Sequence, residues 1–579
     1  MNFSWRQPTS DEFVNYQTFL QMPFPDNALQ AGNGHRPVFP NLVIIAELAW
    51  MHGDHWLQFA VGLIAACATS ALIALAAWRD RQSPLIVRAA CTMLAVLGVF
   101  WLANGRMLFH SYESVHVYLL TLAVVVAGFC VHEASRRQRV RWMVGACAAA
   151  AFAMFCFGSG VAVFPAIIIL GFALRLPARW YGIPAATLAF CLYLYLFALP
   201  GDQGVRGLIS MHPIDSATIA IDWLSSPWVR GWLGHAEPTL DPIATTGIAY
   251  SRMGPQLIAT ANAATALTHL SWSLLARIIS VTGIAAFLYR FIRMTFDRTR
   301  RPSRLEVIAS MLCLFALATA CVIGLGRLGY FEAHPEQVYA DRYLVWPSLF
   351  WTGLALLFVC RLRSDGRGEM SVALTAAVAV LPLALLPTHD ASAIWGSVVY
   401  RRGEQSAAVA RSGIFDPGLF PDGADASRED VLKTLALMRK QRVAMFADGT
   451  FATLGELAHG SLAPANHVTA SARISGIFDD PENQLHAAHF EGMIDEGLRR
   501  FRQGAKLGAV DKNGRIVGLA EFSYIRSDHA LMFTMPAKRG FDGYIRDYRK
   551  DETYRLILLP KDGGDASVIC GIAANPASP

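Results

Sequence analysis

Residues suited to phosphate chemistry gather in three short polar segments that lie between long apolar stretches of the chain. The candidate residues are Asp11, Glu12, Asp26, His35 and Arg36 in the first segment, Arg106 and His110 in the second, and Arg327, Arg342 and Tyr343 in the third. A carboxylate can take the proton of a hydroxyl acceptor. A guanidinium can hold a phosphate through paired hydrogen bonds and stabilise the charge of a departing phosphate. We interpret the three acids as candidate catalytic groups and the other residues as candidate substrate-binding groups.

Each of these residues also has a simpler interpretation. A single acid in a polar loop is most often only solvated, and Arg36, Arg327 and Arg342 are equally suited to contacts with lipid headgroups. A joint site requires the three segments to lie on one side of the same structure.

The apolar stretches between the segments predict that structure. Ten of them have the length needed to cross a hydrocarbon core, about twenty residues. They lie at 56–78, 84–103, 114–132, 142–158, 159–174, 180–200, 270–289, 305–326, 343–360 and 371–388. Residues 217–233 and 257–267 are two further helical candidates, so ten or twelve spans fit equally well. At 54% hydrophobic and 16% charged, the chain is too apolar for a soluble protein of 579 residues. The sequence predicts a mainly α membrane protein with about 10–12 transmembrane helices.

Arginines cluster after every second apolar stretch. The clusters are Arg79, Arg81 and Arg88; Arg136, Arg137, Arg139 and Arg141; Arg175 and Arg179; Arg290, Arg293, Arg298, Arg300, Arg301 and Arg304; and Arg361, Arg363 and Arg367. Short basic loops stay in the cytoplasm. The other loops, the first forty residues and everything after about residue 390 should therefore face outward, and all three polar segments share that outer face.

Residues 1–40 are expected to form an outward N-terminal tail, because they lack the apolar core of a cleavable signal peptide. The alternative is that a preceding span is missing from this version of the sequence. Residues 42–49 are too short to span and contain Glu47, which favours a helix lying at the outer interface.

The composition changes near residue 390, since no lysine occurs before Lys433. We expect a polytopic domain over 41–390 and a water-exposed domain over 391–579. Ser427 and Asp430 form a capping box that predicts a helix, and residues 443–446 follow as a short strand. A hairpin over 506–510 and 515–520, with strands at 531–535, 554–559 and 567–572, predicts a small β-sandwich.

Composition and motifs exclude several classes of function. The net charge of +6 comes mostly from the cytoplasmic arginines and forms no outward basic patch, which argues against nucleic-acid binding. No His/Cys cluster indicates a metal, so no cofactor is expected, with a divalent metal as the alternative. The cysteines lie almost entirely in the apolar stretches and predict no internal disulfide. The GxGxxG match at 324–329 ends a span with no strand before it, so we interpret its glycines as packing residues.

Several short motifs resemble the GT-C superfamily of bacterial membrane glycosyltransferases. They are Asn33-Gly34-His35-Arg36 before the apolar run that starts at Pro37, Ser159-Gly160, Gly326-Arg327, and Asp341-Arg342-Tyr343. The segments 510–520, 526–528 and 540–544 are similar to a β-sandwich appended to such proteins. The resemblance covers most of the chain.

This resemblance implies hexosyl transfer from a polyprenyl-phosphate-linked sugar to a cell-envelope glycan or lipid-linked acceptor, at the outer face of the bacterial cytoplasmic membrane. The partners would be that donor, a glycan or glycolipid acceptor and membrane lipids. The family carries an acidic catalytic residue in its first outward loop, and Asp11 or Asp26 would fill that role. Gly34 stands where the family more often has Glu.

Two other functions fit the same features. A transporter or flippase for a lipid-linked sugar is one, although no ionisable chain crosses the span centres. A non-catalytic scaffold of an envelope-polysaccharide complex is the other, in which the outward domain would recruit partners.

Overall fold

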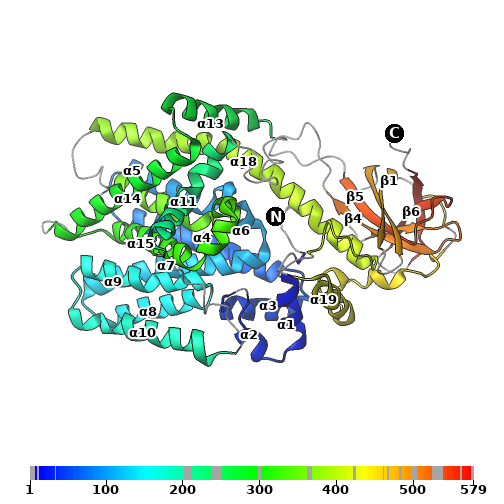
Figure 1. Ribbon diagram of the computed structural model, residues 1–579, viewed down its shortest axis with the longest axis horizontal. Helices are drawn as coiled ribbons and strands as arrows, with labels where there is room; N and C mark the ends of the chain where they lie inside the picture. The colour runs from blue at the N-terminus through cyan, green and yellow to red at the C-terminus, as the bar shows by residue number, and fades with distance from the viewer. Residues whose placement is uncertain are drawn as a thin grey trace. The chain divides into compact units, whose positions relative to one another are not determined.

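The computed structural model of the chain divides into two compact units, whose elements Figure 1 labels. The barrel unit comprises Met1–Pro23, Ala46–His55 and Ser397–Pro579, and the helical unit comprises Phe24–Ile45 and Trp56–Gly396. The structure describes residues 7–8, 12–32, 34–81, 83–200, 212–236, 251–297, 301–360, 368–421, 426–460, 462–465, 468–480, 485–496, 505–523, 539–560 and 564–574.

Apolar helices make up the helical unit. They are α2 (Asp26–Leu29), α4 (Trp56–Trp78), α5 (Leu85–Phe100), α6 (Gly105–Phe109), α7 (Ser111–Arg137), α8 (Val140–Met154), α9 (Val163–Ala173), α10 (Gly182–Tyr193), α11 (Pro213–Gly231), α13 (Gly254–Thr268), α14 (Trp272–Phe296), α15 (Arg304–Gly326), α16 (Leu328–Ala333) and α17 (Val345–Val359). Helices α3 (Val38–Met51) and α18 (Gly368–Arg411) contribute residues to both units.

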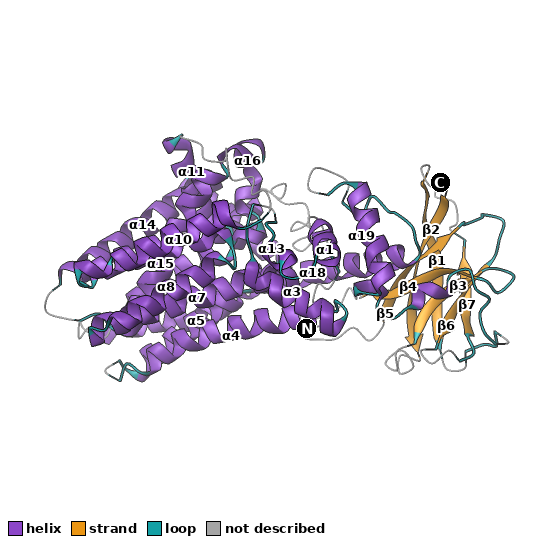
Figure 2. Ribbon diagram, turned by 90° about the horizontal axis from the view of Figure 1, so that it is seen from below, coloured by secondary structure: helices purple, strands orange, loops and turns teal. Residues whose placement is uncertain are grey.

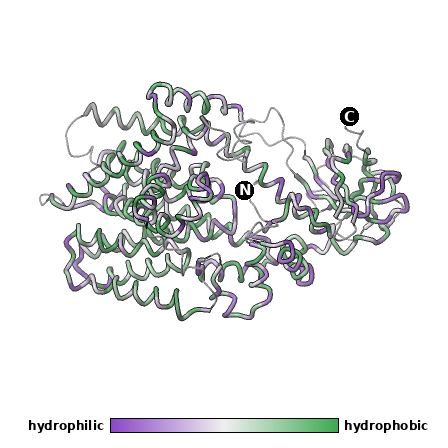
Figure 3. The backbone as a smooth tube through the Cα atoms, in the orientation of Figure 1, coloured by the Kyte–Doolittle hydropathy of each residue, from purple (hydrophilic) through white to green (hydrophobic). Residues whose placement is uncertain are grey.

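All ten predicted apolar stretches are helical, so the mainly α prediction is confirmed. Figure 3 shows that hydrophobic residues predominate along the coils of the helical unit. Among the described residues, seven helices are long and apolar enough to cross a membrane: Trp56–Trp78, Leu85–Phe109, Ser111–Arg137, Ala178–Ala198, Trp272–Phe296, Arg304–Gly326 and Ala376–Arg411. The stretches at 142–158, 159–174 and 343–360 form the shorter apolar helices Val140–Met154, Gly158–Ala173 and Val345–Val359.

Helices α7 and α15 form the centre of the helical unit. In each, 78% of the most apolar window is buried, against 22% for α14. Helix α4 packs on α7, and α15 packs on α17. A Cβ at Gly62 of α4 would lie 2.1 Å from Ser114 Oγ, and one at Gly353 of α17 would lie 2.7 Å from the Ala309 carbonyl oxygen. Helices that approach this closely require glycine at the contact.

A buried carboxylate joins the C-terminal end of α7 to the start of α15. The Glu133 side chain is 1% exposed and accepts hydrogen bonds from Arg137 Nε at 2.6 Å and Arg304 Nη2 at 2.7 Å. Arg136 donates to the same carboxylate at 3.0 Å. Three of the arginines that the sequence analysis assigns to the cytoplasmic clusters are therefore paired with a buried acid.

The barrel unit contains α1 (Glu12–Gln21), α19 (Arg428–Gln441) and a seven-stranded sheet (Figure 2). The strands are β1 (Thr469–Asp480), β2 (Leu485–Glu496), β3 (Lys506–Val510), β4 (Ile516–Ser523), β5 (Arg539–Arg546), β6 (Tyr554–Leu559) and β7 (Ser567–Ala573). They follow the order β1-β2-β5-β4-β3-β6-β7, and parallel pairing of β1 with β7 closes the barrel. The expected sandwich is therefore a barrel, because this pairing leaves no open edge to pack as a second sheet.

Several local predictions in this domain are confirmed. The capping box of Ser427 and Asp430 opens α19, and the turn after Val510 joins β3 to β4. The predicted strand at 443–446 is wrong, because Ala444–Phe446 forms a 3-10 helix. The predicted strand at 531–535 lies outside the described residues.

The N-terminal segment is shared between the two units. Helix α1 packs on α19, where Thr434 Oγ1 donates to the Phe13 carbonyl at 2.9 Å. The Tyr16 hydroxyl and His55 Nε2 are 2.6 Å apart. The residues up to Pro23 therefore fold with the C-terminal domain, and the remainder of the 1–40 segment folds with the helical unit.

Arginines in the last turns of α18 form ion pairs with carboxylates on the barrel strands. Arg401 donates to Asp542 at 2.9 and 3.1 Å, and its Nη2 lies 3.0 Å from Glu491 Oε2. Three turns later, Arg411 pairs with Glu521. Because Asp542 and Glu521 occupy paired positions on neighbouring strands β5 and β4, one helix face neutralises adjacent acids.

We predict that Gly492→Ala destabilises the barrel. A Cβ at Gly492 would lie 2.0 Å from the Ser471 carbonyl oxygen and 2.3 Å from Phe541 Cζ, and a strand carbonyl cannot move without breaking the ladder. We expect a loss of about 1–3 kcal/mol, typical of overpacking, in calorimetric unfolding of the full chain. Gly571→Ala is the matched control, since no heavy atom lies within 4 Å of its Cβ position. Equal stability of the two variants would contradict the close contact.

Candidate functional site

The three candidate acids lie in different surroundings. Asp11 lies outside the described residues. Glu12 begins α1 in the barrel unit and is 1% exposed. Asp26 begins α2 in the helical unit and is exposed. Of the three, only Asp26 belongs to the unit that holds all the candidate substrate-binding residues.

Arg36 is a fully buried anchor. Its guanidinium donates to the carbonyl oxygens of Tyr195 at 2.6 Å, Leu199 at 2.9 Å and Leu29 at 3.2 Å, and to that of Pro200. Burial lowers the pKa of this arginine. These contacts tie the segment after α2 to the end of α10, so Arg36 positions backbone in this structure.

Arg106 lies between two acids in a group that we call the acid–arginine cluster (Arg106, Glu113 and Asp341). Its Nε and Nη2 donate to the Glu113 carboxylate at 2.7 and 2.6 Å, and its Nη1 donates to Asp341 Oδ1 at 3.3 Å. Arg230, at the end of α11, lies 3.7 Å from Asp341. The cluster therefore joins α6, α7, α11 and the short 3-10 helix Asp341–Tyr343.

His110 belongs to the same region as the N-cap of α7. Its Nδ1 accepts from the Glu113 backbone N–H at 3.4 Å and lies 3.6 Å from the Glu113 carboxylate. A carboxylate in the first turn also interacts favourably with the helix dipole. His110 thus holds Glu113 in place and is almost fully buried.

Arg327 and Arg342 converge on one aromatic ring, and we call Arg327, Tyr330, Arg342 and Tyr343 the arginine–tyrosine group. The guanidinium carbons of Arg327 and Arg342 lie 5.9 and 5.8 Å from the Tyr330 ring centroid. Arg342 also lies 5.2 Å from the Tyr343 ring and donates to the Tyr330 hydroxyl at 2.7 Å. In the part of the chain that the structure describes, neither arginine has a carboxylate partner.

His35 packs against the segment that follows α8. Its ring centroid is 4.1 Å from that of Phe157, and a Cβ at Gly158 would lie 2.6 Å from its Nδ1. Burial, with the charges of Arg327 and His116 nearby, lowers the pKa of His35 to about 3. His35 is therefore neutral at physiological pH.

The structure brings together five of the predicted binding residues with partners that the sequence analysis did not select. Glu113, Asp341, His116 and Tyr330 contact or influence them, and Arg230 contacts Asp341. Glu113 could have been found, because an acid three residues after a helix N-cap faces back toward it. Arg230 carries no such local signal, since its partner lies more than a hundred residues away.

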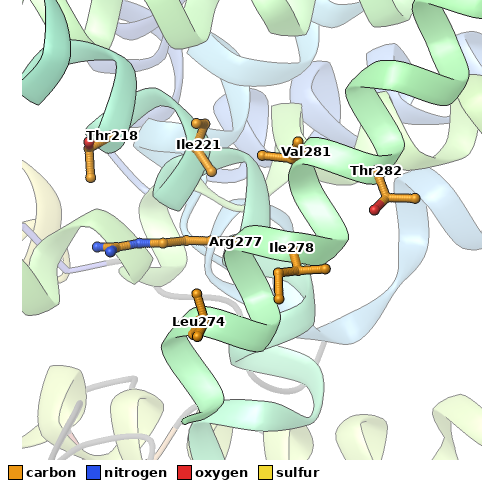
Figure 4. Close-up of a pocket in the computed structure, with 7 residues that line it drawn as sticks. All are labelled: Thr218, Ile221, Leu274, Arg277, Ile278, Val281 and Thr282. Carbon is orange, nitrogen blue, oxygen red and sulfur yellow. The ribbon is translucent and has the colours of Figure 1, made fainter. Parts of the chain in front are cut away.

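An open groove of about 390 Å³ runs between α11 and α14 in the helical unit (Figure 4). Its lining is Thr218, Ile221, Leu274, Arg277, Ile278, Val281 and Thr282. Arg277 makes a bidentate contact with Asp222 of α11, at 2.6 and 2.8 Å. The groove thus combines apolar walls with one neutralised charge pair.

Within the described residues, no group of three His, Cys, Asp or Glu side chains is placed to hold a metal ion. No protein-family model, curated protein or solved structure matches the chain. The case for any function therefore depends on the contacts themselves.

We predict that Glu113→Gln destabilises the helical unit, because Arg106 loses its bidentate partner while remaining half-buried. The expected loss is about 2 kcal/mol, between the values for exposed and buried pairs, measured by thermal unfolding in detergent. Glu332→Gln, an exposed acid, is the control and should change stability by less than about 0.5 kcal/mol. In a double-mutant cycle with Arg106→Gln, additive losses would show that the two groups do not interact.

The neutral His35 predicts a pH dependence of stability. The unfolded chain binds a proton at this residue below about pH 6.5, whereas the folded chain does so only near pH 3. Stability should therefore fall as the pH drops from 6.5 toward 3, by at most about 1.4 kcal/mol per pH unit for one proton. His35→Gln should flatten this slope, and His334→Gln, which replaces an exposed ring, should not. An unchanged slope in His35→Gln would exclude a buried neutral His35.

Proposed function

We propose that the chain is a membrane glycosyltransferase that moves a sugar from a polyprenyl-phosphate donor to a cell-envelope glycan or lipid-linked acceptor. The observation that carries this proposal is the convergence of Arg327 and Arg342 on Tyr330 without a carboxylate partner among the described residues. Both guanidinium groups lie within about 6 Å of one ring centroid, so an anion bound beside that ring would be attracted by two positive charges. A phosphate also matches the paired donors of each guanidinium.

Several buried donors of the helical unit suit a ligand that has a polar but uncharged part. Asn104 Nδ2, Ser159 Oγ, Trp346 Nε1 and Arg342 Nε are buried and have no hydrogen-bond partner within the described residues. Phe157 links one of these positions to His35, since its ring lies 5.5 Å from that of Trp346 and 4.1 Å from that of His35. Because buried donors are normally satisfied, a sugar rich in hydroxyl groups is a suitable complement.

The acids then take two roles. Glu113 and Asp341 are occupied by Arg106 and hold the site together. Asp26 is exposed in the helical unit and is our candidate for the base that takes the acceptor proton. Asp11 and Glu12 are the alternatives for that role.

In this proposal, the helical unit crosses the bacterial cytoplasmic membrane. The seven long apolar helices and three shorter ones make ten spans, and α11 and α13 would make twelve. The arginine clusters would lie in the cytoplasm. The site and the barrel unit would then lie outside, where the barrel would bind a glycan or position the acceptor.

A lipid-linked sugar transporter is the second candidate, favoured by the groove between α11 and α14. Its apolar wall includes Leu274, Ile278 and Val281, which are 44–51% exposed and would contact lipid. A transporter would move the donor lipid without breaking its bond to the sugar.

We predict that the full chain in proteoliposomes transfers radiolabelled sugar from a polyprenyl-phosphate hexose to a glycan acceptor. Arg327→Ala and Arg342→Ala should each lower transfer about 100-fold, the usual loss for one electrostatic contact to a reacting group. Asp26→Asn should lower the maximal rate and leave donor binding unchanged.

Arg139→Ala is the control for these variants, because Arg139 is exposed at the start of α8, away from the arginine–tyrosine group. Absence of transfer by the wild-type protein across a panel of donors would reject the enzyme, and movement of intact donor between leaflets would then favour the transporter. Equal losses in Arg139→Ala and Arg342→Ala would reject the site. Transfer by vesicles that expose only the cytoplasmic face would reject the orientation.

A further inference from the structure

A serine, a histidine and an aspartate lie in contact across three neighbouring strands of the barrel. Ser475 Oγ of β1 is 2.5 Å from His489 Nδ1 of β2. His489 Nε2 is 3.2 Å from Asp542 Oδ1 of β5. None of these residues takes part in the site of the helical unit.

A β-bulge aims Ser475 at the histidine. Ile474 pairs with Phe490 and Gly476 pairs with His489, so Ser475 is an extra residue without a partner position on β2. Bulges are frequent beside active sites because they redirect one side chain out of the regular alternation. Here the redirected hydroxyl is exposed and reaches the imidazole.

Burial increases along the three residues. Ser475 is exposed, the His489 side chain is 18% exposed, and the Asp542 side chain is completely buried. A serine nucleophile needs this order, since the hydroxyl must meet a substrate while the acid is shielded from water.

Asp542 is held in position by donors from α18. Arg401 donates to it at 2.9 and 3.1 Å, and Gln405 Nε2 donates at 2.9 Å. An ionised carboxylate only accepts, so Asp542 favours the His489 tautomer with its proton on Nε2, although the two atoms do not meet hydrogen-bond geometry in this structure. Nδ1 is then free to accept the Ser475 proton. The Tyr544 ring, 5.0 Å from the imidazole, packs against it.

We propose that Ser475, His489 and Asp542 form a second site, which hydrolyses or transfers the acyl group of a small carboxylic ester. Ser475 Oγ attacks the ester carbonyl carbon while its proton passes to His489 Nδ1. The carbonyl–alkoxide bond then breaks, and the departing alkoxide takes that proton. Water, or an acceptor hydroxyl, attacks the acyl-serine with the same proton transfers and releases the acid or the new ester. Ser475 and His489 are the catalytic residues, and Asp542 is a positioning residue.

The test is labelling of the full chain in detergent with a fluorophosphonate probe, followed by peptide mapping and by hydrolysis of p-nitrophenyl acetate. The wild-type protein should be labelled at Ser475, and Ser475→Ala and His489→Ala should be labelled at least 100-fold more slowly. Added imidazole should restore labelling of His489→Ala, which a purely structural role for the histidine does not predict. Ser471→Ala, an exposed serine on the same strand, is the matched control and should react like the wild type.

Asp542→Asn tests the positioning role through the dependence of the labelling rate on pH. A displaced pH profile is expected from loss of the orienting charge, whereas a merely damaged fold would lower the rate equally at every pH. Wild-type labelling no faster than that of Ser475→Ala would overturn the proposal, and so would labelling mapped to another residue. Because this assay uses no sugar donor, its failure is separate from any failure of the proposed sugar transfer.

Discussion

The contact on which the candidate site depends is the pairing of Arg106 with two acids. Glu113 follows it by 7 residues and Asp341 by 235, so one guanidinium connects the start of α7 with the segment before α17. A half-buried arginine needs such partners, because removing its charge from water is costly unless the charge is balanced. Asp341 directly precedes Arg342 and Tyr343, so the same pair determines where the arginine–tyrosine group can lie.

Much of the helical unit was predictable, because its physical cause is local. A run of about twenty apolar residues has few ways to satisfy its backbone except as a helix. The roles of individual charges were not predictable in this way. Arg36 and Arg327 look alike in the sequence, yet Arg36 is surrounded by four backbone carbonyl groups while Arg327 lies over the Tyr330 ring. For Arg36, the difference arises from the end of α10, which supplies three of the four carbonyl groups and lies 159–164 residues later in the chain.

In the barrel unit too, the features set by neighbouring residues were predictable and those set by distant strand pairing were not. The β3–β4 hairpin could be predicted from its turn, because only adjacent residues decide it. Closure of the barrel depends on the pairing of Ala472 with Ile572 and of Arg473 with Ala573. No local sequence pattern predicts that pairing. Ser475 was equally inconspicuous, since a bulge depends on the register of two strands and not on the residue itself.

The packing of α1 on α19 has a consequence for the order of synthesis. Phe13 and Tyr16 are buried in the same apolar cluster as Val431 and Met438, and Thr434 bonds to a carbonyl 421 residues earlier. At typical translation rates of about 5–20 residues per second, the first helix is made roughly 20–80 seconds before its partner. During that interval its apolar face has no α19 to cover it. A ribosome that stalls after residue 396 but before residue 428 would therefore release a chain in which all residues of the helical unit are present while α1 still has no α19 to pack on.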